Sequence, residues 1–145
     1  MQIKLTIALL LILLSFSVMA QDKSNIMDKK YTLESCVNQF DSENLIETKG
    51  GSQYWFVDKQ FLDGRTVKMS MVAPHSFNHP PHSHAEDEIY FILEGSAQFI
   101  LNSDTVIVKP YTSLYSPPES LHGIMNAGDT ELKYLVIKKY AVNKK

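Results

Sequence analysis

Four of the five histidines of this chain lie within ten residues of one another, and the fifth lies far away along the sequence. The four are His75, His79, His82 and His84, and the fifth is His122. Neutral imidazole binds divalent first-row metals. His82 and His84 are two positions apart, so on extended backbone their rings point to the same face. This spacing predicts that the two rings converge on one point.

Acidic residues follow the two histidines and complete the types of side chain that a metal site uses. Glu86 and Glu88 share the parity of the histidines if the strand continues, whereas Asp87 points the other way. Alternation alone does not choose between the two glutamates. His122 joins only if a folded barrel brings it close. A bare His-x-His after Pro80-Pro81, taken by itself, favours two surface histidines in a loop.

The spacing of these residues resembles the two sequence motifs of the cupin superfamily. The first family motif is His-x-His, three or four residues, Glu, six residues and Gly, and it matches His82, His84, Glu88 and Gly95. The second is Pro-x-Gly-x-x-His-x-x-x-Asn, and it matches Pro117, His122 and Asn126. The register selects Glu88 over Glu86. Three family glycines are replaced, by Ser76, Tyr111 and Glu119, so the turns at these positions are expected to differ.

The resemblance implies a small single-domain cupin with an all-β fold, a double-stranded β-helix or jelly-roll barrel. Its metal site would consist of His82, His84, Glu88 and His122, with one divalent ion of Fe, Mn, Ni, Co or Zn. Tyr90 shares the parity of Glu88 and is the candidate catalytic residue, because it could donate a hydrogen bond or a proton to a ligand. We expect His75 and His79 to be rim residues outside the metal site.

The local sequence predicts consecutive strands that would carry these residues. Runs rich in aromatic and β-branched residues, separated by turn signals, are typical of a sandwich or barrel. They cover residues 53–59, 66–73, 88–93, 97–101, 105–109 and 132–140. Asp63-Gly64 predicts a tight turn, and Glu94-Gly95-Ser96 predicts a hairpin. We expect apolar pocket walls, supplied by Met69, Met71, Phe91, Phe99 and Ile107 or by their neighbours of opposite parity.

The N-terminus predicts export. Met1–Ala20 has one charge, a short apolar run and small residues at its end, which is typical of a secretory signal peptide cleaved after Ala20. Localisation would then be periplasmic or secreted, with no stable membrane insertion after cleavage. Residues 21–50 are interpreted as a leader or arm, 51–140 as the barrel and 141–145 as a tail. Lys138, Lys139, Lys144 and Lys145 are expected to be a solvated basic end, and the lone Cys36 is given no function.

Composition limits the function classes. Hydrophobic residues make up 44% of the 145 residues and charged residues 21%, as in globular domains. The formal charge of −2 argues against nucleic acid as a partner. Arg65 is the only arginine, which argues against a phosphorylated substrate. We expect an enzyme acting on a small organic molecule, either dioxygenase-like or a sugar or uronate isomerase or lyase. The alternative is a non-catalytic, metal-dependent binder of a sugar or carboxylate. A homodimer is a family expectation.

Overall fold

The computed structural model describes residues 31–141, and the chain divides into two units, with the boundary after Asn38. The first unit holds the four-residue helix α2 (Leu33–Cys36), which Thr32 caps through a hydrogen bond from the backbone N–H of Ser35. The signal peptide expected at residues 1–20 and the tail from residue 142 onward lie outside the described residues. Within residues 31–141, no helix is long and apolar enough to cross a membrane.

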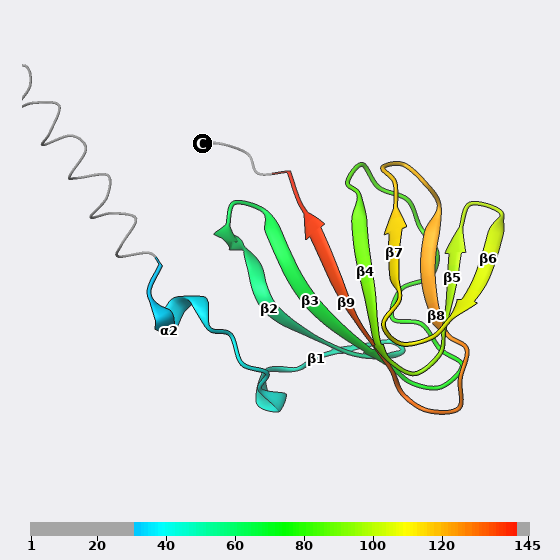
Figure 1. Cartoon of the computed structure of the whole chain (residues 1–145), viewed down its shortest axis with the longest axis horizontal. Coiled ribbons are helices and arrows are strands. Elements are labelled where there is room, and N and C mark those ends of the chain that lie inside the picture. The colour runs from blue at the N-terminus through cyan, green and yellow to red at the C-terminus, as the bar shows by residue number, and fades with distance from the viewer. Residues whose placement is uncertain (1–30, 142–145) are drawn as a thin grey trace, which may run out of the picture. The chain divides into compact units, whose positions relative to one another are not determined.

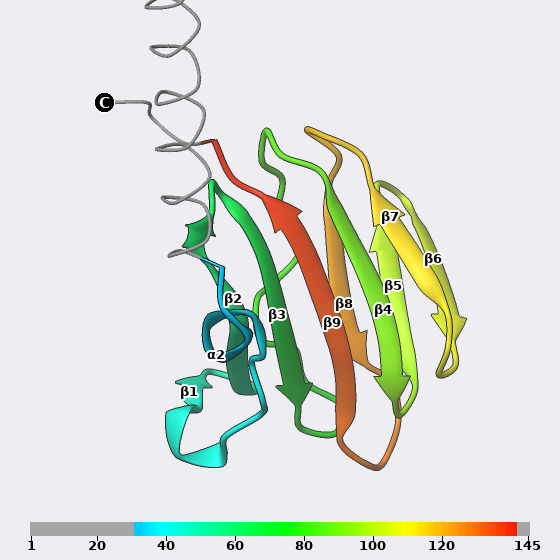
Figure 2. The same cartoon turned by 60° about the vertical axis from the view of Figure 1, so that its left-hand side comes forward.

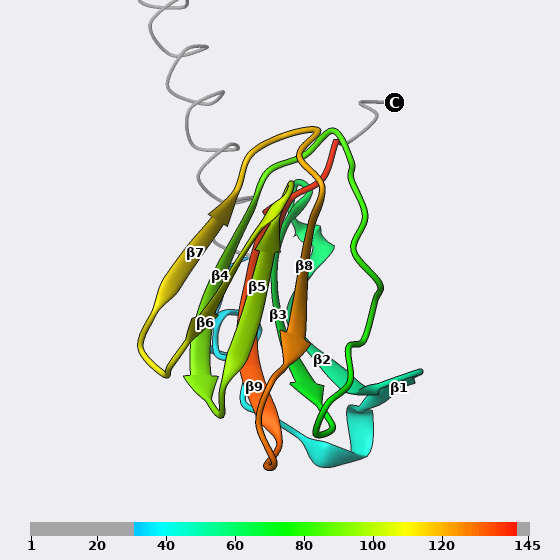
Figure 3. The same cartoon turned by 90° about the vertical axis from the view of Figure 1, so that its right-hand side faces the viewer.

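The second unit is built from two antiparallel sheets, as Figure 1 and Figure 3 show. A short 3₁₀ helix, η1 (Ser42–Asn44), precedes the strands. The six-stranded sheet has the order β1 (Ile46–Thr48), β2 (Gly51–Leu62), β3 (Arg65–Val72), β9 (Leu132–Lys139), β4 (Glu88–Glu94), β7 (Ser113–Ser116). The three-stranded sheet has the order β6 (Asp104–Val108), β5 (Ala97–Leu101), β8 (His122–Asn126). The all-β prediction is confirmed, and the first strand begins within the segment interpreted as a leader.

The alternation of apolar residues located most strands to within a few residues, but one predicted connection is wrong. Asp63 and Gly64 form the tight turn between β2 and β3, where Leu62 pairs with Arg65. The predicted hairpin at Glu94-Gly95-Ser96 does not form. Strand β4 pairs with β7 and β9, whereas β5 pairs with β6 and β8. The three residues instead carry the chain from one sheet to the other, because each of the two strands finds its partners elsewhere.

The core lies between the two sheets, and β4, β5 and β9 each contribute residues of one parity to it. Figure 2 shows β3, β9 and β4 side by side in the larger sheet. The buried apolar cluster consists of Val72, Tyr90, Ile92, Ala97, Phe99, Ile124, Leu132, Tyr134 and Val136. On β9 the buried positions alternate strictly, and the alternation continues to Lys138, which is 7% exposed. The expectation that Lys138 belongs to a solvated basic end is therefore wrong.

The turns that lack the family's glycines keep a left-handed backbone. Tyr111 has φ of 64° and Glu119 has φ of 61°, the region that ordinarily favours glycine. The backbone of these two turns therefore keeps the conformation that glycine would adopt, and the expectation that the turns would differ is wrong for the backbone. Ser76 is different, because the positive φ there belongs to its neighbour His75. Asn126 matches the second motif and is fully buried, and its amide donates to the carbonyl oxygen of Val72 on β3 at 2.9 Å.

Candidate metal centre

The histidines converge because two distant segments pair. His82 lies in the loop before β4, and His122 begins β8. Their backbones form an isolated antiparallel bridge, with N–H to carbonyl distances of 3.0 and 2.9 Å. One ring nitrogen from each of His82, His84 and His122 lies within 4.8 Å of the other two. The sequence prediction that a folded barrel would bring His122 to the pair is met in the geometry.

A backbone carbonyl fixes the orientation of each of the three rings. Each Nδ1 lies within hydrogen-bonding distance of a carbonyl oxygen two residues away: Pro80 for His82 at 3.0 Å, Glu86 for His84 at 2.8 Å and Ser120 for His122 at 2.9 Å. A carbonyl oxygen only accepts, so Nδ1 must carry the proton and donate it. The lone pair of every ring is then on Nε2. This is the tautomer that a metal-binding histidine adopts when its other nitrogen is fixed by a backbone oxygen.

The Nε2 atom of His122 is a buried polar atom that has no hydrogen-bond partner in the described part of the chain. His122 is 1% exposed, and among residues 31–141 no group forms a hydrogen bond with this nitrogen. Burial lowers the pKa of His122, outweighing the hydrogen bond to the Ser120 carbonyl and the charge of Glu88, which would raise it. The ring is therefore neutral near pH 7. Buried polar atoms in native proteins are nearly always satisfied, so this nitrogen calls for a ligand.

Glu88 is the carboxylate that lies beside the histidines. Its Oε1 is 3.3 Å from Nε2 of His84, and its Oε2 is 3.6 Å from Nε2 of His122. Burial by itself would raise the pKa of Glu88, but the hydrogen bond donated by Tyr90 and the nearby Lys138 lower it below its usual range. Strand β4 begins only at Glu88, so the alternation from His82 does not extend through Glu86. Glu86 instead offers its backbone carbonyl to His84.

Lys138 enters this centre, which the sequence interpretation missed. Its Nζ lies 2.9 Å from Nε2 of His84, 3.1 Å from Oε1 of Glu88 and 3.6 Å from Oε2 of Glu86. Because Nε2 of His84 is unprotonated, the ammonium donates to it. The signal was present in the sequence, since Lys138 continues the alternation of Leu132, Tyr134 and Val136.

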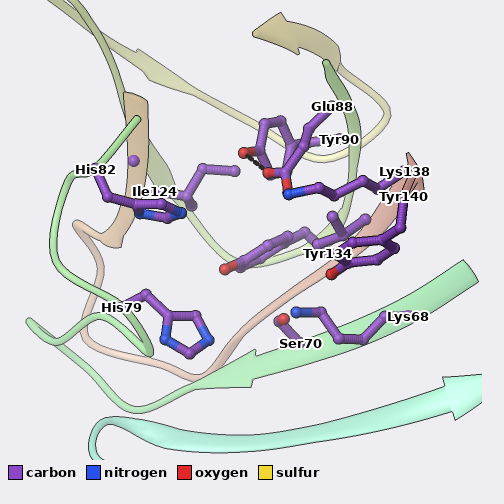
Figure 4. A pocket seen from close by; sticks show the side chains of 12 residues that line it. Lys68, Ser70, His79, His82, Glu88, Tyr90, Ile124, Tyr134, Lys138 and Tyr140 are labelled. Atoms are coloured by element: carbon purple, nitrogen blue, oxygen red, sulfur yellow. Dashed lines mark hydrogen bonds and ion pairs between the residues drawn. The ribbon is translucent and has the colours of Figure 1, made fainter. Parts of the chain in front are cut away.

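A cavity of about 170 Å³ opens beside the centre (Figure 4). Its walls include Lys68 and Ser70 from β3, Tyr134, Val136 and Lys138 from β9, Ile124 from β8, and the side chains of His79, His82, Glu88, Tyr90 and Tyr140. Met69 and Met71 lie on the other parity of β3, and Ile107 is 62% exposed. The expectation of apolar walls is therefore wrong, because the inward parity of β3 and β9 contains two lysines.

The other candidate residues, Tyr90, His75 and His79, have different surroundings. Tyr90 is buried, and its hydroxyl donates to Glu88. Burial, together with the neighbouring charge of Glu88, raises the pKa of Tyr90 far above its usual value, so the phenol keeps its proton. His75 is bonded to Asp129 at 2.9 Å on the surface. His79 lines the cavity, with its ring centroid 6.4 Å from that of His82.

The donor set fits a metal ion. Two atoms that bind one ion at about 2.1 Å are at most about 4.2 Å apart, so the distances from Glu88 to His84 and His122 suit a shared ion. The histidine nitrogens, which spread over up to 4.8 Å, need only small shifts of their rings. Three imidazoles and one carboxylate are a ligand set for Mn, Fe, Co, Ni or Zn. Lys138 must release Nε2 of His84 before that nitrogen binds an ion.

Comparison with known proteins agrees with the geometry. The sequence model described as "Cupin domain" matches residues 68–138. One curated relative, an uncharacterized protein of Methanocaldococcus jannaschii, is 40% identical over 55 residues, which is 37% of this chain. The match spans 44% of that relative, so less than half of its length is covered.

Solved structures share the fold. A predicted oxalate decarboxylase from Thermotoga maritima has a TM-score of 0.59 and 25% identity, covering 66% of this chain and 89% of that one. The polyketide cyclase RemF from Streptomyces resistomycificus has a TM-score of 0.60 and 19% identity, covering 71% and 79%. A cupin 2 conserved barrel domain protein from Salinispora arenicola has a TM-score of 0.62 and 20% identity, covering 72% and 88%.

Proposed function

We propose that this chain, which belongs to the cupin superfamily, is a metal-dependent enzyme that acts on a small organic molecule. The observation that carries the proposal is the arrangement of the three histidines. Each ring is fixed through Nδ1, and one nitrogen of each faces a common point. The fully buried Nε2 of His122 has no partner among the described residues, which a purely structural histidine would have.

In this proposal His82, His84, Glu88 and His122 hold one divalent transition metal, which would supply Lewis-acid chemistry or, as iron, react with dioxygen. Tyr90 orients Glu88 through its hydrogen bond and keeps its own proton. To act as a hydrogen-bond donor to a ligand, the catalytic role proposed for it, the hydroxyl would have to turn from Glu88 to that ligand, because a phenol has a single O–H. Lys138 balances the charge of Glu88 and lies at the cavity wall, within reach of a bound molecule.

The cavity size narrows the reaction class. An apolar cavity of about 150 Å³ accepts a molecule as large as benzene, so about 170 Å³ suits roughly six non-hydrogen atoms. This favours a lyase or isomerase acting on a small acid over a dioxygenase of a large aromatic substrate, and also over an enzyme of a hexose or uronate, which has about twice as many non-hydrogen atoms. The similarity to a predicted oxalate decarboxylase, named for a small dicarboxylate, points the same way. A metal-dependent binder of a sugar or carboxylate, without turnover, is the second candidate, because Tyr90 keeps its proton and Lys138 is committed to ion pairs.

Export is part of the proposal and rests on the composition of residues 1–20. The expected partner is a small molecule in the periplasm or outside the cell. A homodimer remains a family-based proposal. Cleavage is checked by N-terminal sequencing of the protein recovered from the extracytoplasmic fraction, where Gln21 should be the first residue. Retention of residues 1–20 there would contradict it.

The function is tested first by elemental analysis of the purified full chain. We expect about one transition-metal ion per chain, lost in a His82→Ala/His84→Ala variant that keeps its far-ultraviolet circular dichroism. His75→Ala is the matched control, because His75 is bonded to Asp129 on the surface. Turnover of small acids and sugars is then followed with and without dioxygen. A wild-type chain that neither holds nor recovers a metal would contradict the proposal, and metal-dependent binding without product would favour the binder.

A further inference from the structure

The cavity beside the histidines contains two lysines whose surroundings differ. Lys138 has its charge offset by Glu88 at 3.1 Å and by Glu86 at 3.6 Å. Lys68 on β3 has no carboxylate within ion-pairing distance anywhere in residues 31–141. Its ammonium lies 5.3 Å from the centroid of the Trp55 ring. One wall of the cavity therefore presents a cation without an anion.

The half-buried position of Lys68 makes this an unusual place for an uncompensated charge. A surface lysine is solvated by bulk water, whereas Lys68 lines a small cavity and is only partly exposed. Burial lowers the pKa of Lys68, Lys138 adds to that effect, and Glu88 opposes it. The lysine is thus held in a position that costs free energy without a counter-charge. An anion bound in the cavity would remove that cost.

Neutral hydrogen-bonding groups surround the ammonium of Lys68. Figure 4 shows the hydroxyl of Ser70 beside it and the ring of His79 facing the same part of the cavity. Ser70 is 2% exposed, so its hydroxyl is directed inward, where it also forms a side-chain hydrogen bond with Tyr134. His82 and Glu88 lie at the other end of the cavity. Lys68 and the residues of the histidine centre therefore line one and the same cavity, so a molecule bound in it would lie between them.

We infer that Lys68, with Ser70 and His79, forms an anion subsite that holds a carboxylate of a small organic acid. The inference names the substrate class of the proposed function and rests on it for the second end of the ligand. A carboxylate is favoured over a phosphate because one lysine and two neutral groups offer few charged donors, and the described residues place no arginine at the cavity. The volume limits the acid to roughly the size of malonate.

The test measures binding of malonate to the full chain by calorimetry, with malonamide as the neutral probe of equal size. Metal-free and zinc-loaded protein are both titrated. We expect wild type to bind malonate at least tenfold more tightly than malonamide in both states. Lys68→Met should weaken malonate binding about tenfold or more, because a charge-assisted hydrogen bond is lost. Lys68→Arg should retain it, and the matched control Lys139→Met, on the exposed parity of β9, should leave it unchanged.

Each result has a defined meaning. Malonate affinity that Lys68→Met leaves within twofold of wild type would overturn the subsite, as would no malonate binding to wild type in either state. Inorganic phosphate binding more tightly than malonate would overturn the carboxylate assignment. Lys68→Met should not weaken zinc binding, because Lys68 is not among the proposed ligands. A wild type that binds malonate through Lys68 but no metal would support the subsite and refute the proposed function.

Discussion

Replacing Lys138 by Met should make metal binding tighter and the metal-free fold weaker. Lys138 donates to Nε2 of His84 at 2.9 Å, and a metal needs that same nitrogen. The ammonium also pairs with Glu88 at 3.1 Å, the proposed carboxylate ligand. In the metal-free protein it therefore acts as a tethered cation that competes with the ion. Met keeps the length and most of the volume of the side chain and removes only its charge and its donors.

The size of both effects follows from these contacts. A hydrogen bond involving a charged group contributes about 1.5–3 kcal/mol, which metal binding to His84 has to break. Its absence should raise zinc affinity about 10- to 100-fold, at about 1.4 kcal/mol for each factor of ten. Removing one partner of a buried ion pair costs about 3–5 kcal/mol. Since Lys138 is 7% exposed and the Glu88 side chain 11%, the metal-free variant should lose about 3 kcal/mol of unfolding free energy.

The assay combines zinc titration by calorimetry with urea unfolding, each with and without metal. The zinc-induced gain in unfolding free energy should be larger in Lys138→Met than in wild type by about 1.5–3 kcal/mol at equal free zinc. Lys139→Met controls for loss of a positive charge, because Lys139 is exposed on the same strand. Zinc affinity that stays within twofold of wild type, or falls, would refute the competition and would make Lys138 a support for Glu88 instead.

Three further predictions concern the centre and its turns. His122→Ala should lower the zinc affinity measured by calorimetry at least 100-fold. The substitution removes a ligand that is 1% exposed and leaves a void that solvent cannot easily reach. Unchanged zinc affinity would remove His122 from the ligand set. Gly95→Ala should lower the free energy of urea unfolding by about 2 kcal/mol or more, since Gly95 has φ of +84° and an added Cβ would lie 2.7 Å from a backbone oxygen. Gly128→Ala is the control, because a Cβ added at Gly128 meets nothing closer than 3.3 Å. Equal losses in the two variants would contradict the reasoning. Tyr111→Gly should raise the free energy of unfolding by about 0.5–1 kcal/mol, because Tyr111 has φ of 64° and is 83% exposed. Tyr111→Ala should not raise it. A lower free energy of unfolding in both variants would show that the tyrosine ring itself stabilises the fold.

The sequence predicted six of the nine strands found in residues 31–141 from local alternation and missed β1, β7 and β8, whereas the convergence of His122 on His82 and His84 was expected from the family resemblance. Alternation locates a strand that has one buried face, as in the run from Leu132 to Lys139. His82 and His122 were joined by two motifs whose spacing the family shares, and the backbone bridge between them explains why the match succeeds. Glu88 was selected by register, and the structure places its carboxylate beside both His84 and His122.

The sequence did not predict the sheet that each strand joins or the polarity of the cavity. The Gly95 turn looks like a hairpin locally, and only long-range pairing sends β4 and β5 into different sheets. The near-zero net charge of the chain gave no indication that two lysines line the cavity. Lys68 and Lys138 line the same cavity because β3 and β9 are neighbours with Lys68 opposite Val136, a register that depends on the complete sheet. Strict application of alternation would have placed Lys138 inside, but its position near the chain end favoured a solvated interpretation.

The two lysines give the metal and anion sites a common electrostatic origin. In the metal-free form Glu88 neutralises Lys138, and of the two lysines that line the cavity Lys68 is the one left without an ion-pairing carboxylate among residues 31–141. If an ion takes Glu88 and His84, Lys138 loses those partners and the cavity gains positive charge. An organic acid should then bind more tightly to zinc-loaded protein than to metal-free protein. Because linkage is reciprocal, malonate should increase zinc affinity by the same factor. Titrating zinc with and without saturating malonate measures that factor, and in Lys138→Met it should be smaller, since the released charge is absent. Equal factors in wild type and variant would show that Lys138 does not couple the two sites.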